Sequence, residues 1–262
     1  MVTDDDSRVV LFPTIHILPP ELEWQDQSIK DALFRADEVW FELLPSEATN
    51  ERRMQQLAVK YGVDPQGSLK DKLDDKTYKE FSLAARRLGM LPEQLDTLRP
   101  WLAAITLITA DLIADGFDPG AGAEMVLAQQ VPVSKHRAFE TADEQLALFA
   151  ALSPELELAL LQQTLEEIGR SGSELRQLAT AWSEGDLSSL EELTIRSLKD
   201  VSEELYQSLL VRRNEAWAEQ LAEEMKGSGD VFIAVGGGHL VGDDSLPKLM
   251  KSRGYAVVGP DL

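Results

Sequence analysis

Two histidines and one glutamate, each at the end of a short apolar run, are the residues best suited to chemistry. His16 follows "RVVLFPTI", Glu42 lies within "VWFELLP", and His239 follows "VFIAVGGG". The chain has three histidines and no cysteine, which excludes zinc–thiolate sites and cysteine nucleophiles. Two imidazoles and a carboxylate in one place can hold a divalent cation and leave positions open for water. Taken singly, each has a plain structural alternative, a hydrogen-bonded core histidine or a paired carboxylate.

The runs that precede these residues have the composition of strands. β-Branched and aromatic residues predict a strand over about 8–15, and the continuous apolar run that ends at Pro45 predicts another. The segment between them, "QSIKDALFRADE", has helical spacing, so we expect a parallel βαβ unit. "GDVFIAVGGGHLVG" predicts a further strand that ends in a glycine-rich turn. If these strands are parallel in one sheet, His16, Glu42 and His239 emerge at its carboxyl edge, where ligands bind.

The rest of the chain is mostly helical. "VPVSKHRAFE" predicts a strand, and the Leu-rich and Glu-rich segments over about 142–226 predict amphipathic helices with a solvated face. The chain then returns to strand, helix and strand through "SLPKLMKSRG" and "YAVVG". We therefore predict an α/β fold in one domain over 1–262. A small, mainly parallel sheet is built from the N- and C-terminal parts, and a large helical insertion forms a subdomain at about 142–226.

The charge balance narrows the class of partner. There are 46 Asp and Glu against 25 Lys and Arg, a net charge of −21, and such a surface repels nucleic acid and anionic lipid. No apolar run reaches the ~18–20 residues of a membrane span. "MVTDDDSR" lacks the features of a signal peptide, so we expect either a cytoplasmic protein or an exported one without its leader. We expect a peptide or small-molecule substrate. The sequence does not predict the oligomeric state.

Three glycines precede His239. Gly236, Gly237 and Gly238 allow a ligand or a neighbouring chain to come close, and we predict that they bind substrate. A dinucleotide site is the rival interpretation. The spacing G-x-G-x-x-x-G, with Gly242 as its last member, departs from the dinucleotide pattern, and too few residues follow for the usual acidic partner. A serine hydrolase is disfavoured because there is no G-x-S-x-G motif.

At these motifs the sequence resembles the TraB/GumN family, which includes the Tiki metalloproteases. "PTIHILPP" and "VGGGHLVGDDSLPKLMKSRGYAVV" are similar to its two G-x-x-H motifs, and "EVWFELLP" to its glutamate motif. "AFETADEQLALFAAL" and "LYQSLLVRRNEAWAEQL" extend the resemblance over nearly the whole chain. It implies a fold similar to erythromycin esterases and haem-binding ChaN proteins, an α/β core with helical additions. Pro13 stands where the first motif normally has glycine, and if that glycine takes positive φ, we expect a reshaped turn before His16.

The resemblance also implies a function. It implies a metal-dependent hydrolase, for Tiki-like members a peptidase, that uses a divalent cation such as manganese or cobalt, with zinc as a third choice. Carried over to this chain, His16, His239 and Glu42 are the metal ligands. Glu42 is also a candidate general base for a metal-activated water, and Glu140 of "AFET" is a further ligand or proton carrier.

Other residues and other functions stay open. Arg213 and Asn214 of "RRNEAW" are candidates to bind the substrate or an oxyanion, although Arg213 also fits a surface helix position. His136, between two basic residues, is expected to be exposed. One alternative to the hydrolase is a non-catalytic protein of the same fold that holds haem, a metal or a peptide in the equivalent cleft. Another is a protein that binds partners through the acidic helices of about 142–226. Convergence of His16, Glu42 and His239 favours the hydrolase.

Overall fold

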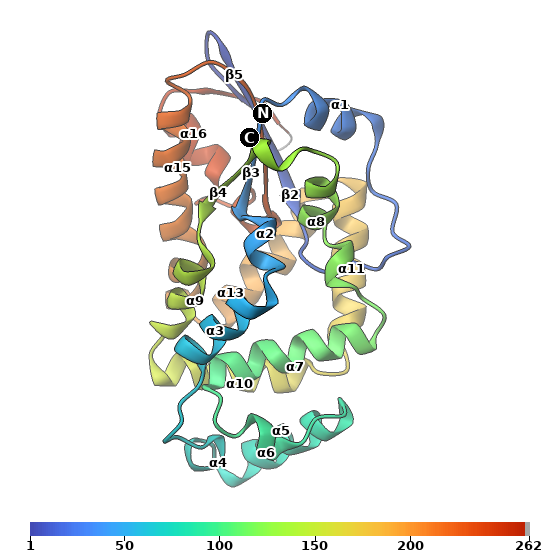
Figure 1. Cartoon of the computed structure of the whole chain (residues 1–262), viewed down its shortest axis with the longest axis vertical. Coiled ribbons are helices and arrows are strands. Elements are labelled where there is room, and N and C mark those ends of the chain that lie inside the picture. Colours follow the sequence, from blue (N-terminus) through green and yellow to red (C-terminus); the bar gives the residue numbers. More distant parts are fainter. Residues whose placement is uncertain (260–262) are drawn as a thin grey trace. The chain divides into compact units, whose positions relative to one another are not determined.

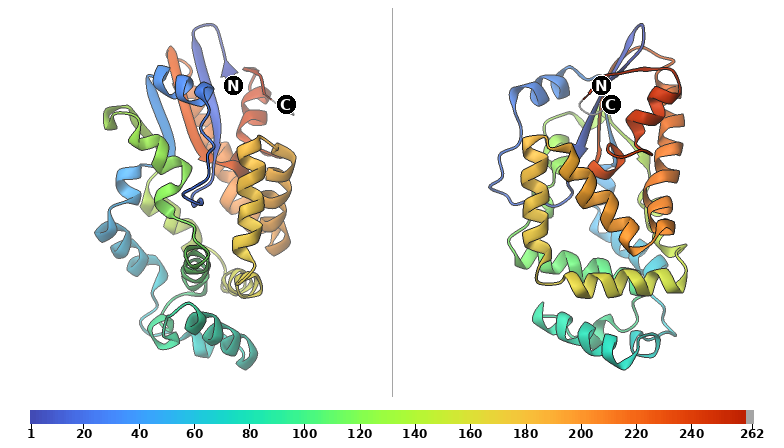
Figure 2. Two further views of the ribbon diagram at one scale, coloured as in Figure 1. Left: turned by 90° about the vertical axis from the view of Figure 1, so that its right-hand side faces the viewer. Right: turned by 180° about the vertical axis from the view of Figure 1, so that it is seen from behind.

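The computed structural model describes residues 1–259 and contains a six-stranded sheet in the order β4-β3-β5-β2-β1-β6. The strands are β1 (Val2–Thr3), β2 (Ser7–Thr14), β3 (Glu38–Leu43), β4 (His136–Glu140), β5 (Gly229–Gly236) and β6 (Ala256–Val257). The four central strands β4, β3, β5 and β2 are parallel, while β1 pairs antiparallel with both β2 and β6. Blue N-terminal strands and the orange-red β5 lie side by side in Figure 2. The predicted α/β fold, with a mainly parallel sheet from both ends of the chain, is confirmed.

The residues form two compact units. The first comprises 1–46, 118–141 and 177–262 and contains the sheet, and the second comprises 47–117 and 142–176 and is helical. The helical segment predicted over 142–226 is thus shared between them. Its first part, 142–176, lies in the helical unit, and 177–226 lies in the unit with the sheet. Figure 1 labels the main elements of both.

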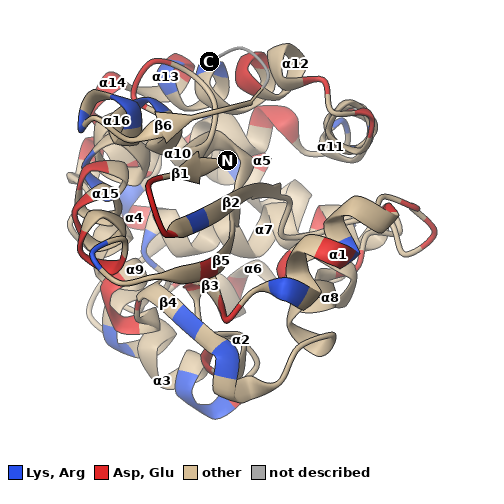
Figure 3. Cartoon of the chain, turned by 90° about the horizontal axis from the view of Figure 1, so that it is seen from above, with Lys and Arg blue, Asp and Glu red and all other residues tan. Residues whose placement is uncertain are grey.

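Helices cover both faces of the sheet. The helices of the first unit include α1 (Gln27–Arg35), α8 (Ala123–Gln129), α12 (Leu187–Glu191), α13 (Ser197–Val201), α14 (Glu203–Tyr206), α15 (Arg212–Glu224) and α16 (Leu246–Ser252). A further helix, α11 (Ser171–Glu184), begins in the second unit and continues into the first. Two π-helical segments, η3 (Glu192–Arg196) and η4 (Gln207–Val211), interrupt this series. Short helical turns occur at Pro119–Ala121, Val133–Lys135 and Gly237–His239. In Figure 3, α1 and α8 lie on one side of the central strands and α15 and α16 on the other.

Alternation along β5 explains this arrangement, because successive side chains of a strand point to opposite faces. Ile233 and Val235 pack with Trp217 of α15 and Leu246 of α16. Phe232 and Ala234 pack in a different core with α1 and α8. β5 is therefore buried on both faces, as its continuous apolar sequence predicts.

The helical unit is held by its own core. Its helices are α3 (Glu51–Gly62), α4 (Leu69–Lys72), α5 (Asp75–Arg87), α6 (Pro92–Leu95), α7 (Pro100–Ala114), α9 (Ala142–Ala150) and α10 (Pro154–Glu167), and α2 (Pro45–Ala48) leads into it. Phe81, Leu107 and Leu161 are fully buried where α5, α7 and α10 pack. Asp74 caps α5, because its carboxylate accepts from the Thr77 N–H at 2.9 Å. None of the helices described in 1–259 combines the length and apolar character needed to cross a membrane.

Candidate functional site

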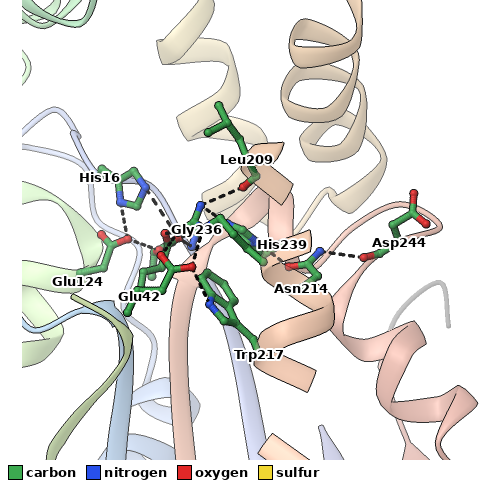
Figure 4. A network of polar contacts seen from close by, with 12 residues as sticks. His16, Glu42, Glu124, Leu209, Asn214, Trp217, Gly236, His239 and Asp244 are labelled. Carbon is green, nitrogen blue, oxygen red and sulfur yellow. Dashed lines mark hydrogen bonds and ion pairs between the residues drawn. The ribbon is translucent and has the colours of Figure 1, made fainter. Parts of the chain in front are cut away.

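The carboxyl ends of the four parallel strands bring the predicted chemical residues to one place. Glu42 is the last residue but one of β3, Glu140 ends β4, and His16 and His239 follow β2 and β5. Glu42 Oε1 lies 4.0 Å from His16 Nε2 and 3.7 Å from His239 Nε2. Figure 4 shows this network from close by. The structure therefore brings His16, Glu42 and His239 together, as expected if the strands are parallel.

Glu42 is a buried carboxylate with strong partners. Its Oε1 accepts from the Gly236 N–H at 2.7 Å, and its Oε2 accepts from Arg213 Nη2 at 2.6 Å. Burial alone raises the pKa of Glu42, but His239, Arg213 and His16 outweigh it and hold the pKa well below its usual range. The group is therefore ionised, and it is suited to hold a cation more than to take up a proton.

His239 is fixed in one tautomer. Its Nδ1 lies 2.6 Å from Asn214 Oδ1, and Asn214 Nδ2 donates to the Asp244 carbonyl at 2.8 Å, which directs the amide oxygen at the ring. His239 Nδ1 therefore carries the hydrogen, and Nε2 is an acceptor directed toward Glu42 and Arg213. Burial lowers the pKa of His239 to about 3, so the ring is neutral. Asn214, predicted to bind substrate, is itself buried and lies behind His239 as its orienting partner.

His16 is paired with a glutamate that the sequence did not single out. His16 Nδ1 lies 2.6 Å from Glu124 Oε1, and Thr14 Oγ1 donates to the same carboxylate. Glu124 raises the pKa of His16 to about 10, so the imidazole is protonated at neutral pH. The side chain of His16 is 67% exposed, in contrast to that of His239. His16 is thus the solvent-facing member of the pair.

A close approach of two segments places Glu124 at the site. The Ala123 N–H donates to the Ile15 carbonyl at 3.0 Å, which ties the start of α8 to the end of β2. A β-carbon at Gly122 would lie 2.2 Å from the His16 carbonyl oxygen, so only glycine fits there. The local sequence pattern of this stretch did not mark Glu124 as a site residue. The glycines before Glu124 are the one local signal of this close approach. They can be interpreted only once the two segments are known to touch.

Arg213 lies at the centre of the network. Its guanidinium donates to Glu140 from Nε at 2.8 Å and from Nη2 at 2.9 Å, and Nη2 also contacts Glu42. Its Nη1 donates to the Leu209 carbonyl at 3.0 Å and lies 3.1 Å from His239 Nε2. The side chain is only 12% exposed, so the alternative of a surface helix residue is wrong. Arg213 is the second residue of α15, which directly follows the π-helical η4, an irregularity often found at functional sites.

Trp217 completes the wall behind Arg213. Its ring centroid lies 4.7 Å from the guanidinium carbon of Arg213, and its Nε1 donates to Glu140 at 2.9 Å. The ring centroid is 4.2 Å from that of His239. No local pattern distinguishes this tryptophan from the other four in the chain. One turn of helix separates it from Arg213, so both side chains leave the same face of α15.

Two of the three glycines before His239, Gly236 and Gly237, are needed for close packing. A β-carbon at Gly236 would lie 2.9 Å from Glu42 Oε1 and 3.5 Å from His16 Nε2. One at Gly237 would lie 2.9 Å from Leu190, whereas Gly238 has more room. None of these three takes positive φ. Gly236 therefore lets Glu42 come close, and a role of the three in substrate binding stays a prediction.

Pro13 does not disturb the position of His16. It lies within β2, in parallel register with Val235, so it continues the strand instead of forming a turn. β1 pairs only with Arg8 and Val9, which leaves Pro13 at an open edge where a missing N–H is tolerated. Its carbonyl accepts from Trp182 Nε1 at 2.8 Å. The expected reshaping of a turn before His16 is therefore not seen.

His136 lies away from the site. It begins β4, whereas Glu140 ends it, and four residues of strand span about 13 Å. Its ring packs edge-on against Phe41 and is half-buried, so the expectation of an exposed residue is wrong. His136 is a suitable control for the two site histidines.

The donor atoms match a divalent cation in kind. Both site histidines have Nδ1 bonded to an oxygen acceptor and Nε2 directed at Glu42, the arrangement that metal-ligating histidines adopt. As the side chains stand, no group of three His, Cys, Asp or Glu within residues 1–259 is spaced to hold an ion. Arg213 Nη1 takes the lone pair of His239 Nε2. The residues thus match an ion in donor chemistry, and the Arg213 guanidinium would have to move for His239 Nε2 to bind one.

Comparison with known proteins gives relatives but no solved structure. The model of the TraB/PrgY/gumN family matches residues 1–258. The uncharacterized protein YbaP of Escherichia coli is 25% identical over 187 residues, which cover 70% of this chain and 68% of that protein. An uncharacterized protein of Treponema pallidum is 22% identical over 259 residues, 94% of this chain and 78% of the relative. No solved structure matches the chain.

Proposed function

This chain belongs to the TraB/PrgY/gumN family, and we propose that it is a divalent-metal-dependent hydrolase with its centre at His16, Glu42 and His239. One observation carries the proposal. Two imidazoles from different strands turn Nε2 toward the same carboxylate oxygen, and each has its Nδ1 bonded to an acceptor. A core histidine with a merely structural role needs no such pairing. The reaction class and a peptide substrate come from the family resemblance.

Each residue has a distinct task in this proposal. A bound divalent ion would lower the pKa of a water molecule that it holds toward neutrality. Manganese or cobalt is the first choice of ion, and zinc is the third. His16, His239 and Glu42 would hold that ion. Because His16 is protonated at neutral pH, it must lose a proton to act as a ligand, and ion binding releases that proton.

Glu140 and Arg213 support the centre from behind. Glu140 is held by Arg213 and Trp217, so its carboxylate is fixed in orientation. Arg213 already uses its donors on Glu42, Glu140 and the Leu209 carbonyl. Its task is therefore to hold both carboxylates in place, and it reaches a substrate oxygen only after it leaves one of these partners.

Hydrolysis with and without added ions tests the proposal. Protein stripped with a chelator is incubated with a peptide library and then supplied with manganese, cobalt or zinc. We expect cleavage only with an ion, loss of cleavage in His16→Ala and His239→Ala, and full cleavage in the control His136→Ala. Cleavage that is unchanged by stripping, or lost equally in all three variants, would contradict the proposal.

A non-catalytic binding protein is the second candidate. The observation that favours it is the guanidinium of Arg213, which already neutralises Glu42 and Glu140 at the centre. Such a centre is stable without an ion and does not require turnover. Saturable binding of haem, metal or a peptide, with no cleavage of any library member under any ion, would support this alternative.

A further inference from the structure

A cavity of about 220 Å³ lies beside β2 in the unit that contains the sheet. Its apolar walls come from β2, from α12 and from the segment that follows His239, and they include Leu11, Pro13, Leu187, Leu240 and Val241. The proposed hydrolytic centre uses none of these side chains. The volume suits a molecule about the size of one amino acid.

One hydroxyl in the cavity wall has no hydrogen-bond partner among residues 1–259. Ser245 lines the cavity and is 1% exposed, and its Oγ is buried without a hydrogen-bond partner in residues 1–259. Ser245 precedes α16, but its side chain does not cap that helix. Buried hydroxyls are normally paired, so an unpaired one in a cavity wall is free to bond a molecule that enters the cavity.

A cation lies in the same wall. Lys248 lines the cavity three residues after Ser245, and its Nζ pairs with Asp243 Oδ1 at 2.8 Å. The Asp243 side chain is 99% exposed, so this pair is weak and can be exchanged for another anion. Glu191 of α12 also lines the cavity and repels a negative group from its own side. Charge therefore directs an anionic group toward Lys248.

We propose that this cavity binds a small apolar molecule that carries one carboxylate. The carboxylate lies at Lys248 Nζ and Ser245 Oγ, and the apolar body lies against Leu11, Leu187 and Leu240. Leu240 directly follows His239, so the occupant touches the segment that carries a site histidine. The C-terminal residue of a peptide and a short fatty acid both have this chemistry.

Calorimetry with matched probes tests the proposal and separates these two sources. N-Acetyl-leucine represents a peptide C-terminus, hexanoate represents a fatty acid, and N-acetyl-leucinamide lacks the carboxylate. We expect at least one of the two carboxylate probes to bind with 1:1 stoichiometry. N-Acetyl-leucinamide is expected to bind about tenfold more weakly or not at all. Preference for N-acetyl-leucine indicates a peptide end, and preference for hexanoate indicates a fatty acid.

Variants show whether the binding is at this cavity. Lys248→Met and Ser245→Ala are each expected to weaken binding about fivefold or more, whereas the exposed Lys251→Met on the same helix binds as wild type. Leu187→Trp, which fills the cavity, is expected to abolish binding. His16→Ala is expected to bind normally, so failure of the hydrolytic centre does not affect the result.

The unpaired hydroxyl gives a separate readout. Ser245→Ala is expected to leave the melting temperature of the ligand-free protein unchanged or raised, because its Oγ has no partner to lose. Weakened binding in that variant is then not a folding defect. Absence of binding by both carboxylates, unchanged binding in Lys248→Met and Ser245→Ala, or a lowered melting temperature for Ser245→Ala would overturn the proposal.

Discussion

Arg213→Met is the substitution with the largest expected effect on stability. Methionine keeps most of the apolar stem, but it removes the charge from between Glu42 and Glu140. The three side chains are 12%, 9% and 12% exposed, so little solvent is available to replace the lost partner. Removal of one member of a buried ion pair costs about 3–5 kcal/mol, and we expect the free energy of unfolding to fall by about 4 kcal/mol at pH 7.

The stability cost of Arg213→Met is expected to depend on pH through the ionisation of Glu42. In the wild type, burial opposes ionisation of Glu42, but His239, Arg213 and His16 outweigh it and lower the pKa. The Glu42 carboxylate therefore stabilises the fold above its unfolded pKa of about 4.3, and this contribution is lost as the pH falls. Without Arg213, burial raises the folded pKa of Glu42, and protonation then stabilises the variant. The difference between the two proteins is expected to narrow from pH 7 to pH 4.

Urea unfolding followed by tryptophan fluorescence measures this difference, because four of the five tryptophans belong to the unit with the sheet. Arg8→Met is the matched control. Arg8 pairs with Asp230, but both side chains are about one-third exposed, so we expect a cost below about 1 kcal/mol. Equal costs for Arg213→Met and Arg8→Met, or a gap that widens toward pH 4, would refute the view of Arg213 as the charge that holds the site together.

Three further predictions concern the histidines and the glycine at the site. Because Glu124 raises the pKa of His16 to about 10, their ion pair stabilises the fold below about pH 6.5, and the contribution is lost as the pH rises through about 10. NMR titration of metal-free Glu124→Gln is expected to move the His16 midpoint back toward 6.5, and a midpoint that stays near 10 would contradict this. His239 is expected to show no titration between pH 8 and pH 4, since burial lowers its pKa to about 3; a midpoint near 6.5 would show that the ring is not buried as described. Gly236→Ala, whose β-carbon would lie 2.9 Å from Glu42 Oε1, is expected to weaken ion binding in calorimetry about tenfold, and unchanged affinity would argue against Glu42 as a ligand.

Local pattern was enough to predict the strand ends and the residues on them. His16, Glu42 and His239 each follow or end an apolar run, and parallel strands deliver such residues to one edge whatever the helices do. The short strand Val2–Thr3 was missed, because two residues are too few for a period to show. Its antiparallel pairing with β2 makes the sheet mixed.

The remaining members of the site depend on tertiary packing. Glu124 reaches His16 because the start of α8 is tied to Ile15, a contact that no local pattern encodes. Arg213 looked equally suited to solvent, since the helical spacing of its segment does not say which face docks on the sheet. Pro13 led us to expect a reshaped turn before His16, but the residue lies within β2, in register with Val235.

Divalent-ion calorimetry on chelator-treated protein tests the central claim most directly. With manganese, cobalt or zinc, we expect wild type and His136→Ala to bind about one ion and to release a proton from His16 at pH 8, while folded His16→Ala and His239→Ala bind none. No ion bound by the wild type, or equal affinity in all four proteins, would contradict a metal centre at His16, Glu42 and His239.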